Sequence, residues 1–162
     1  MARDDSAESS EPALADRVLL VEDSEDDIFQ FQRLLRRAST DTALDIATDG
    51  ESAVKWLDER LAEHASGKAA LPRALFLDLR LPGMRGSEVL KWIRRQHPLD
   101  RALVVVWSSS IELRDIAEAD RLGADLYVNK FPNAEQFTAL MRVTDPRSLR
   151  PEVFGDHRGA VR

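Results

Sequence analysis

Five polar side chains in this sequence stand where runs of hydrophobic residues end. They are Glu22, Asp23, Asp78, Ser108 and Lys130. Carboxylates with no histidine or cysteine among them are oxygen ligands of the kind that Mg²⁺ or Mn²⁺ prefers. A carboxylate can also act as a nucleophile toward a phosphoryl group, while a metal ion and a lysine offset the charge on that group. The residue types therefore point to metal-assisted phosphoryl chemistry.

Each of these side chains also has an ordinary structural explanation. Two acids can begin a helix, a serine can cap one, and a lysine can simply be solvated. If the hydrophobic runs are parallel strands, however, their carboxyl ends meet at one edge of a sheet, where open α/β folds place their ligands. Convergence at one edge favours a common site. Within it, Asp78 at the end of the middle strand is the expected phosphoryl acceptor, and the Ser108 hydroxyl is expected to bond a phosphoryl oxygen.

The rest of the sequence alternates short hydrophobic runs with stretches of helical periodicity. Strands are predicted at 17–21, 44–48, 73–78, 102–107 and 126–129. Helices are predicted at 24–38, 51–65, 87–95, 112–122 and 134–143. Five β-α units in succession predict an α/β fold with a five-stranded parallel sheet, helices on both faces and right-handed crossovers.

Three helix ends carry recognisable boundary residues. Ser24 precedes a run of acids and is a candidate N-cap, and Gly123 is expected to end a helix in a left-handed conformation. Asn133 and Gln136 have the spacing of a capping box.

Composition excludes several classes of protein. The net charge of −6 provides no positive field that would attract DNA or other nucleic acids. No hydrophobic run is long enough to span a membrane, and the first residues lack the apolar core of a signal peptide. The absence of cysteine excludes disulfides and thiolate metal sites, and we expect a cytoplasmic protein.

The chain is expected to contain one domain between two tails. Residues 1–16 hold five acids and almost no residue that could be buried, which predicts a flexible tail. The domain is expected at 17–143. Residues 144–162 have few hydrophobic groups and are expected to form a second tail.

Four motifs coincide with the strand ends. They are Val21-Glu22-Asp23, Leu77-Asp78-Leu79-Arg80-Leu81-Pro82-Gly83, Val106-Trp107-Ser108-Ser109-Ser110 and Gly123-Ala124-Asp125-Leu126-Tyr127-Val128-Asn129-Lys130. Together they resemble the receiver domain of two-component response regulators over about residues 16–143. The resemblance implies a flavodoxin-like, doubly wound (βα)5 fold and a phospho-accepting signalling switch, not a conventional enzyme.

The resemblance also implies a role for each residue. Asp78 would accept a phosphoryl group from a sensor histidine kinase. The acid pair Glu22 and Asp23, together with Asp78 and the backbone carbonyl of Arg80, would bind the metal ion. Lys130 would contact the phosphoryl group. The switch residues would be Ser108, through its hydroxyl, and Tyr127, through its ring.

The subfamily is indicated by a long second helix and by Phe131, which follows the lysine where receivers usually have proline. These features, with the Trp-Ser-Ser-Ser turn, resemble stand-alone regulators of phytochrome-type sensor kinases. Phe131 is expected to place an exposed aromatic ring near the site.

Only 19 residues follow position 143, too few for a helix-turn-helix effector. Output is therefore expected through protein contacts or through onward transfer to a phosphotransfer protein in a phosphorelay. The expected surface is the fourth helix, fifth strand and fifth helix, which would bind a partner or form a homodimer. Its candidate contacts are Leu113, Arg114, Arg121, Phe137 and Met141, some of which are expected to belong to the core.

Two alternatives are open at this point. A degenerate receiver could act as an interaction module without phosphorylation, although the complete set of site residues argues against this. An aspartyl-phosphate phosphatase of the haloacid dehalogenase type would need a second carboxylate two residues after the nucleophile, where Arg80 stands.

Overall fold

All five predicted β-α units are present in the structure, a computed structural model that describes residues 15–38, 41–143 and 146. The strands are β1 (Ala15–Val21), β2 (Ala43–Ala47), β3 (Pro72–Leu77), β4 (Leu103–Ser108) and β5 (Leu126–Asn129). The α-helices are α1 (Glu25–Ala38), α2 (Gly50–Ala65), α3 (Gly86–Arg94), α4 (Leu113–Arg121) and α5 (Ala134–Met141). No predicted boundary differs from these by more than two residues. The fold is the α/β fold with a five-stranded parallel sheet that the sequence predicted.

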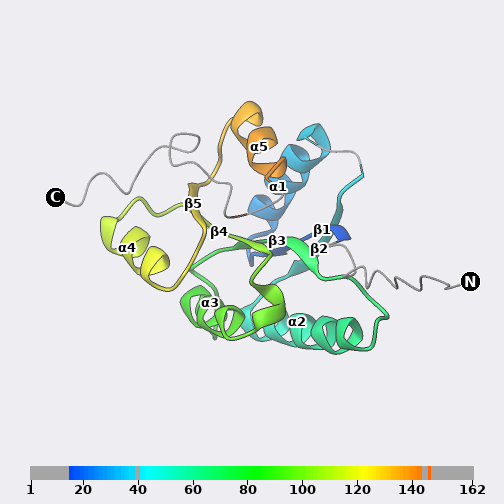
Figure 1. Ribbon diagram of the computed structural model, residues 1–162. Coiled ribbons are helices and arrows are strands. Elements are labelled where there is room, and N and C mark those ends of the chain that lie inside the picture. Colours follow the sequence, from blue (N-terminus) through cyan, green and yellow to red (C-terminus); the bar gives the residue numbers. More distant parts are fainter. Residues whose placement is uncertain (1–14, 39–40, 144–145, 147–162) are drawn as a thin grey trace, which may run out of the picture.

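The five strands form one parallel sheet in the order β2-β1-β3-β4-β5 (Figure 1). Strand β3 is therefore the middle strand. Leu77 at its end is in register with Val21 of β1 and with Val106 of β4. Because these strands end at nearly the same level, the residues that follow them are neighbours at one edge of the sheet.

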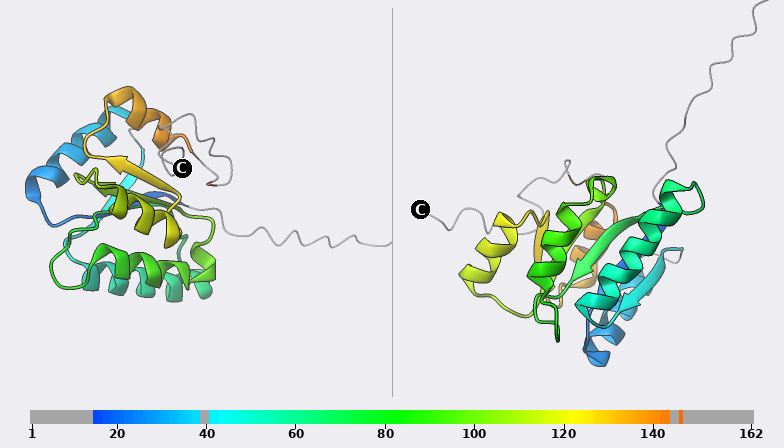
Figure 2. Two further views of the ribbon diagram at one scale, coloured as in Figure 1. Left: turned by 90° about the vertical axis from the view of Figure 1, so that its left-hand side faces the viewer. Right: turned by 90° about the horizontal axis from the view of Figure 1, so that it is seen from below.

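Helices cover both faces of the sheet (Figures 1 and 2). Helices α1 and α5 lie on one face, whereas α2 and α3 lie on the other, with α4 contributing to the same core as these two. Alternate strand residues serve the two cores: Val18 and Leu20 face α1 and α5, and Leu19 and Val21 face the opposite side. This two-sided burial explains why the strands read as continuous hydrophobic runs.

The core between the sheet and α1 and α5 is built on aromatic rings. Phe31, Phe76, Trp107 and Phe137 are all fully buried, and most of their ring pairs pack edge to face. Of the five candidate contacts, some of which were expected to belong to the core, Phe137 and Met141 are buried in this core and are excluded as surface contacts. They lie on the face of α5 that packs against α1.

The three predicted helix ends are confirmed. The Ser24 hydroxyl accepts a hydrogen bond from the amide of Asp27 at 3.3 Å, and Asn133 and Gln136 form the reciprocal capping box. Gly123 has a φ of 92° at the end of α4. A short 3-10 helix at His97–Leu99 was not predicted. Its sequence contains Pro98 near the helix start, where the missing amide proton does no harm.

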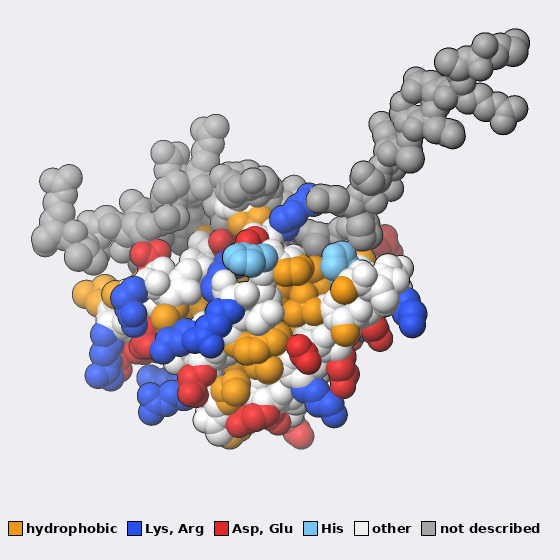
Figure 3. Space-filling model, turned by 60° about the horizontal axis from the view of Figure 1, so that its bottom comes forward, with side chains coloured by type: hydrophobic (Ala, Val, Ile, Leu, Met, Phe, Trp, Pro, Cys, Tyr) orange, Lys and Arg blue, Asp and Glu red, His pale blue; other side chains and the backbone are white. Residues whose placement is uncertain are grey.

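The two predicted tails, 1–16 and 144–162, lie almost wholly outside the described residues, so the domain limits stay a prediction. None of the helices in the described part of the chain combines the length and hydropathy of a membrane-spanning segment. On the side that carries α2 and α3, acidic, basic and hydrophobic side chains are interspersed (Figure 3). The described residues on this side form no continuous basic face.

Candidate functional site

The hydrogen-bond ladder of the sheet continues past the strand ends and fixes the backbone of the site residues. The amide of Asp78 donates to the Val21 carbonyl at 3.0 Å. The amide of Lys130 donates to the Ser108 carbonyl at 2.9 Å. These bonds tie the residues at the strand ends to the neighbouring strands, so the backbone positions of Asp78 and Lys130 are fixed by the sheet.

Three carboxylates surround the ammonium group of Lys130. Its Nζ lies 2.8 Å from Asp78 Oδ2, 2.5 Å from Glu22 Oε2 and 2.9 Å from Asp27 Oδ2. The Lys130 side chain is only 4% exposed. Water therefore screens these interactions weakly, and the buried charges are stabilised chiefly by one another.

These contacts shift the pKa of two groups in the site. Burial alone would lower the pKa of Lys130, but hydrogen bonds to Asp78, Glu22 and Asp27 outweigh burial and raise it, so the ammonium stays charged. Burial raises the pKa of the Glu22 carboxyl above its ordinary value. The contacts that Glu22 makes with Lys130 and the amide of Ser24 offset this only in part.

Glu22, Asp23 and Asp78 form a group that could hold a metal ion. One oxygen of each lies within 4.8 Å of the others. Glu22 and Asp78 are buried, whereas Asp23 is exposed and faces solvent. An all-oxygen donor set that is open to water fits a hard divalent cation such as Mg²⁺ or Mn²⁺, which retains several waters in proteins.

The loop after β3 packs closely around Asp78. The amide of Arg80 donates to Asp78 Oδ1 at 2.9 Å, which places the Arg80 backbone beside the acid. A Cβ atom on Gly86 would lie 2.1 Å from the carbonyl oxygen of Asp78. Only a glycine therefore allows α3 to begin so close to this residue. From α2, the Glu51 carboxylate accepts a hydrogen bond from the amide of Met84 at 3.0 Å and holds the far side of the loop.

The two predicted switch residues meet at Ser110. Ser108 is fully buried, and its hydroxyl accepts a hydrogen bond from the amide of Ser110 at 3.2 Å. The Tyr127 hydroxyl donates to the Ser110 carbonyl at 2.9 Å. The Ser110 hydroxyl in turn donates to Asp115 of α4 at 2.6 Å. Ser110 thus links both switch residues to the first turn of α4.

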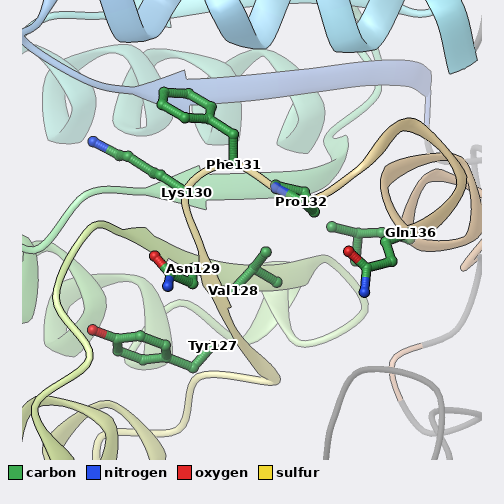
Figure 4. A pocket seen from close by; sticks show the side chains of 8 residues that line it. Tyr127, Val128, Asn129, Lys130, Phe131, Pro132 and Gln136 are labelled. Carbon is green, nitrogen blue, oxygen red and sulfur yellow. The ribbon is translucent and has the colours of Figure 1, made fainter.

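The end of β5 presents its side chains to both sides of the strand. Figure 4 shows Tyr127 and Lys130 directed to the same side of β5, away from Gln136. The peptide bond between Lys130 and Phe131 is cis. Phe131 is 45% exposed, which confirms the expectation of an exposed aromatic ring beside the site.

Sequence reasoning missed two residues of this network, Asp27 and Ser110. Asp27 lies in the first turn of α1, whereas Asp23 precedes the helix, so no helical spacing in the sequence relates Asp27 to the other site residues. Ser110 was noted as part of a motif, but nothing in the sequence showed that its polar groups connect Ser108, Tyr127 and α4.

Comparisons with known proteins agree with this geometry. The sequence pattern of the response regulator receiver domain matches residues 18–142. The chain is 31% identical over 137 residues to the response regulator Rcp1 of Synechocystis sp., a match that covers 85% of this chain and 89% of Rcp1.

Solved structures show the same likeness. The phosphorylated cyanobacterial phytochrome response regulator RcpA superposes with a TM-score of 0.64 at 33% identity, over 77% of this chain and 87% of RcpA. The Mn²⁺-bound form of Rcp1 gives a TM-score of 0.62 at 31% identity, over 77% of this chain and 88% of that one. The predicted likeness to phytochrome-type regulators is thereby confirmed. The chain belongs to the response regulator receiver domain family of two-component signalling.

Proposed function

We propose that this protein accepts a phosphoryl group on Asp78 from a sensor histidine kinase of phytochrome type. The observation that carries the proposal is the ammonium of Lys130, which lies 2.8 Å from Asp78 at the centre of an acidic sheet edge. A permanently charged donor beside a carboxylate is suited to stabilise a phosphoryl group on that carboxylate. The related regulator RcpA, whose structure is that of a phosphorylated protein, supports this assignment.

In the proposed step, an oxygen of Asp78 attacks the phosphorus of a phosphohistidine. The P–N bond breaks as the P–O bond forms, and the histidine leaves. Lys130 is placed to neutralise part of the negative charge on the phosphoryl oxygens. Glu22, Asp23, Asp78 and the backbone carbonyl of Arg80 would hold Mg²⁺. When bound, this ion supplies further positive charge to the transferred group and orients it.

The signal would then pass through Ser108 and Tyr127. A phosphoryl oxygen that bonds the Ser108 hydroxyl would favour one of two arrangements of the loop that ends in Ser110. The Tyr127 hydroxyl is already bonded to this loop. Helix α4 follows directly, so the surface formed by α4, β5 and α5 would respond. We propose that this surface binds a partner, a phosphotransfer protein or a second copy of the chain.

Exposed hydrophobic groups and a pocket support a binding role for this surface. Ile111 and Leu113 are 73% and 63% exposed near the start of α4. A pocket of about 230 Å³ runs along β5 and the start of α5, where Phe131 forms part of its wall (Figure 4). Exposed apolar groups are common at sites of protein contact.

The acceptor is tested by treatment with acetyl phosphate and Mg²⁺. The intact mass should rise by one phosphoryl group, and Asp78→Asn should abolish the increase. Asp120→Asn, which removes an exposed acid from α4, is the matched control and should label normally. Labelling of Asp78→Asn at the parent rate would show that another residue is the acceptor. An unlabelled parent protein would favour an interaction module that works without phosphorylation.

A further inference from the structure

One acid in the site has no part in the proposed phosphoryl transfer or metal binding. Asp27 lies on the first turn of α1, and its Oδ2 is 2.9 Å from the Nζ of Lys130. Its backbone amide is held by the hydroxyl of Ser24 at 3.3 Å, which fixes this turn of the helix. The contact joins residues that are 103 positions apart in the sequence.

The ammonium of Lys130 donates hydrogen bonds to Asp27 and Asp78, and the carboxylate of Glu22 lies against it as well. A lysine ammonium carries three N–H groups. Three carboxylate oxygens, from Glu22, Asp27 and Asp78, lie within 2.9 Å of this nitrogen. Because these oxygens enclose the ammonium, a phosphoryl oxygen on Asp78 can approach Lys130 only if one of the carboxylates moves away from it.

The three carboxylates differ in how easily they can be released. The Glu22 side chain is 1% exposed and that of Asp78 is 9% exposed, and Asp78 would itself carry the phosphoryl group. The Asp27 side chain is 28% exposed. A carboxylate that already contacts water loses least when its ion pair breaks, because solvent replaces the lost partner.

We infer that Asp27 is a positioning residue that holds Lys130 in the unphosphorylated protein and competes with the phosphoryl group for it. The inference rests on the proposed function of Asp78. It adds that Asp27 influences the equilibrium between the unphosphorylated and the phosphorylated state. Asp27 favours the unphosphorylated state in two ways. Its carboxylate accepts a hydrogen bond from the Lys130 ammonium that a phosphoryl oxygen could otherwise accept. Its negative charge also repels the negatively charged phosphoryl group, because both lie next to the same ammonium.

The experiment measures binding of beryllofluoride, a phosphoryl mimic, by ¹⁹F NMR at saturating Mg²⁺. Asp27→Asn keeps the size of the side chain and removes its charge. It should lower the beryllofluoride concentration at half-saturation about fivefold, the size expected for a partly exposed ion pair. Asp26→Asn is the matched control, since it removes an equal charge from the same helical turn at an exposed position. It should leave binding nearly unchanged.

Whether beryllofluoride binds more tightly or more weakly to Asp27→Asn shows whether Asp27 competes with the phosphoryl group for Lys130 or positions Lys130 to bind it. If Asp27 merely holds Lys130 in place for the phosphoryl group, Asp27→Asn will bind beryllofluoride more weakly, and this result overturns the inference. Equal binding by the parent and Asp27→Asn also overturns it. A cooperative thermal unfolding transition first shows that Asp27→Ala is folded. This variant should then bind beryllofluoride more tightly than the parent, as Asp27→Asn does. Failure of the parent itself to bind, with Asp78 intact, would instead refute the proposed function on which the inference rests.

Discussion

At the scale of single residues, the site is a group of acids organised by one lysine. The proximity of Asp78, Glu22, Asp23 and Lys130 was predictable because these residues follow the ends of strands, and the ends of parallel strands meet at one edge. The part played by Asp27 was not predictable. The contact between Asp27 and Lys130 depends on which face of α1 lies toward Lys130. A side chain in the first turn of a helix can equally well point to solvent.

Glu22 is predicted to reduce stability in metal-free protein at neutral pH. Burial raises the pKa of its carboxyl, so the folded chain binds this proton more tightly than the unfolded chain. The free energy of unfolding should therefore fall as pH rises from the ordinary glutamate pKa through the raised one. In EDTA, Glu22→Gln should flatten this fall and unfold at a higher temperature at neutral pH, as followed by circular dichroism.

Glu25→Gln is the control, because Glu25 is an exposed acid nearby. It should keep the pH dependence of the parent. A Glu22→Gln protein that is less stable than the parent at neutral pH, with an unchanged slope, would show that the ion pair with Lys130 outweighs burial.

At the scale of elements, the position of Asp78 depends on how α3 packs against the end of β3. The amide of Gly86 donates to the Leu79 carbonyl at 3.2 Å, and Gly86 itself has no room for a side chain. The glycine was visible in the sequence, but its close approach to Asp78 was not, since this depends on the angle at which α3 leaves the loop. The existence and order of the helices followed from periodicity alone.

Gly86→Ala is predicted to destabilise the fold by about 3 kcal/mol, at the upper end of the range for overpacking, because the clash is with backbone that cannot move aside. It should also slow labelling by acetyl phosphate, since relief of the clash displaces Asp78. Gly67→Ala is the comparison. A Cβ there meets nothing within 4 Å, although the φ of 72° makes the substitution unfavourable by about 1 kcal/mol. Denaturant unfolding of both variants gives the difference, and equal losses would contradict the packing argument.

At the scale of the whole molecule, the site lies where two separate cores meet the end of one sheet. Trp107 belongs to the core under α1 and α5, whereas Tyr127 packs against the core under α2 and α3. The composition and the hydrophobic pattern of the sequence predicted that helices cover both faces of the sheet. They could not predict which residues of α5 face inward, so which of the candidate contacts belong to the core, Phe137 and Met141, was known only from the structure.

Phosphorylation is predicted to alter the surface of α4, β5 and α5 more than the helices on the far side. Hydrogen exchange with and without beryllofluoride should show changed protection near Ser108, Ser110 and Tyr127 and in the first turn of α4. Light scattering under the same conditions tests whether the chain forms a dimer. Asp78→Asn should show neither response. Changes confined to α1 and α2 would contradict this route for the signal.

The long sequence separations within the site have a consequence for synthesis of the chain. Lys130 contacts Asp78 and Asp27 across 52 and 103 residues, and it follows the last strand of the sheet. During translation Asp27 and Asp78 leave the ribosome before Lys130, the basic residue with which both of them pair. An incomplete chain would gather unpaired negative charge at the edge of a half-built sheet, which opposes its collapse. Once Lys130 has been synthesised, it pairs with these acids and removes the repulsion. The carboxylates of the site therefore also disfavour folding of a chain whose synthesis ends before Lys130.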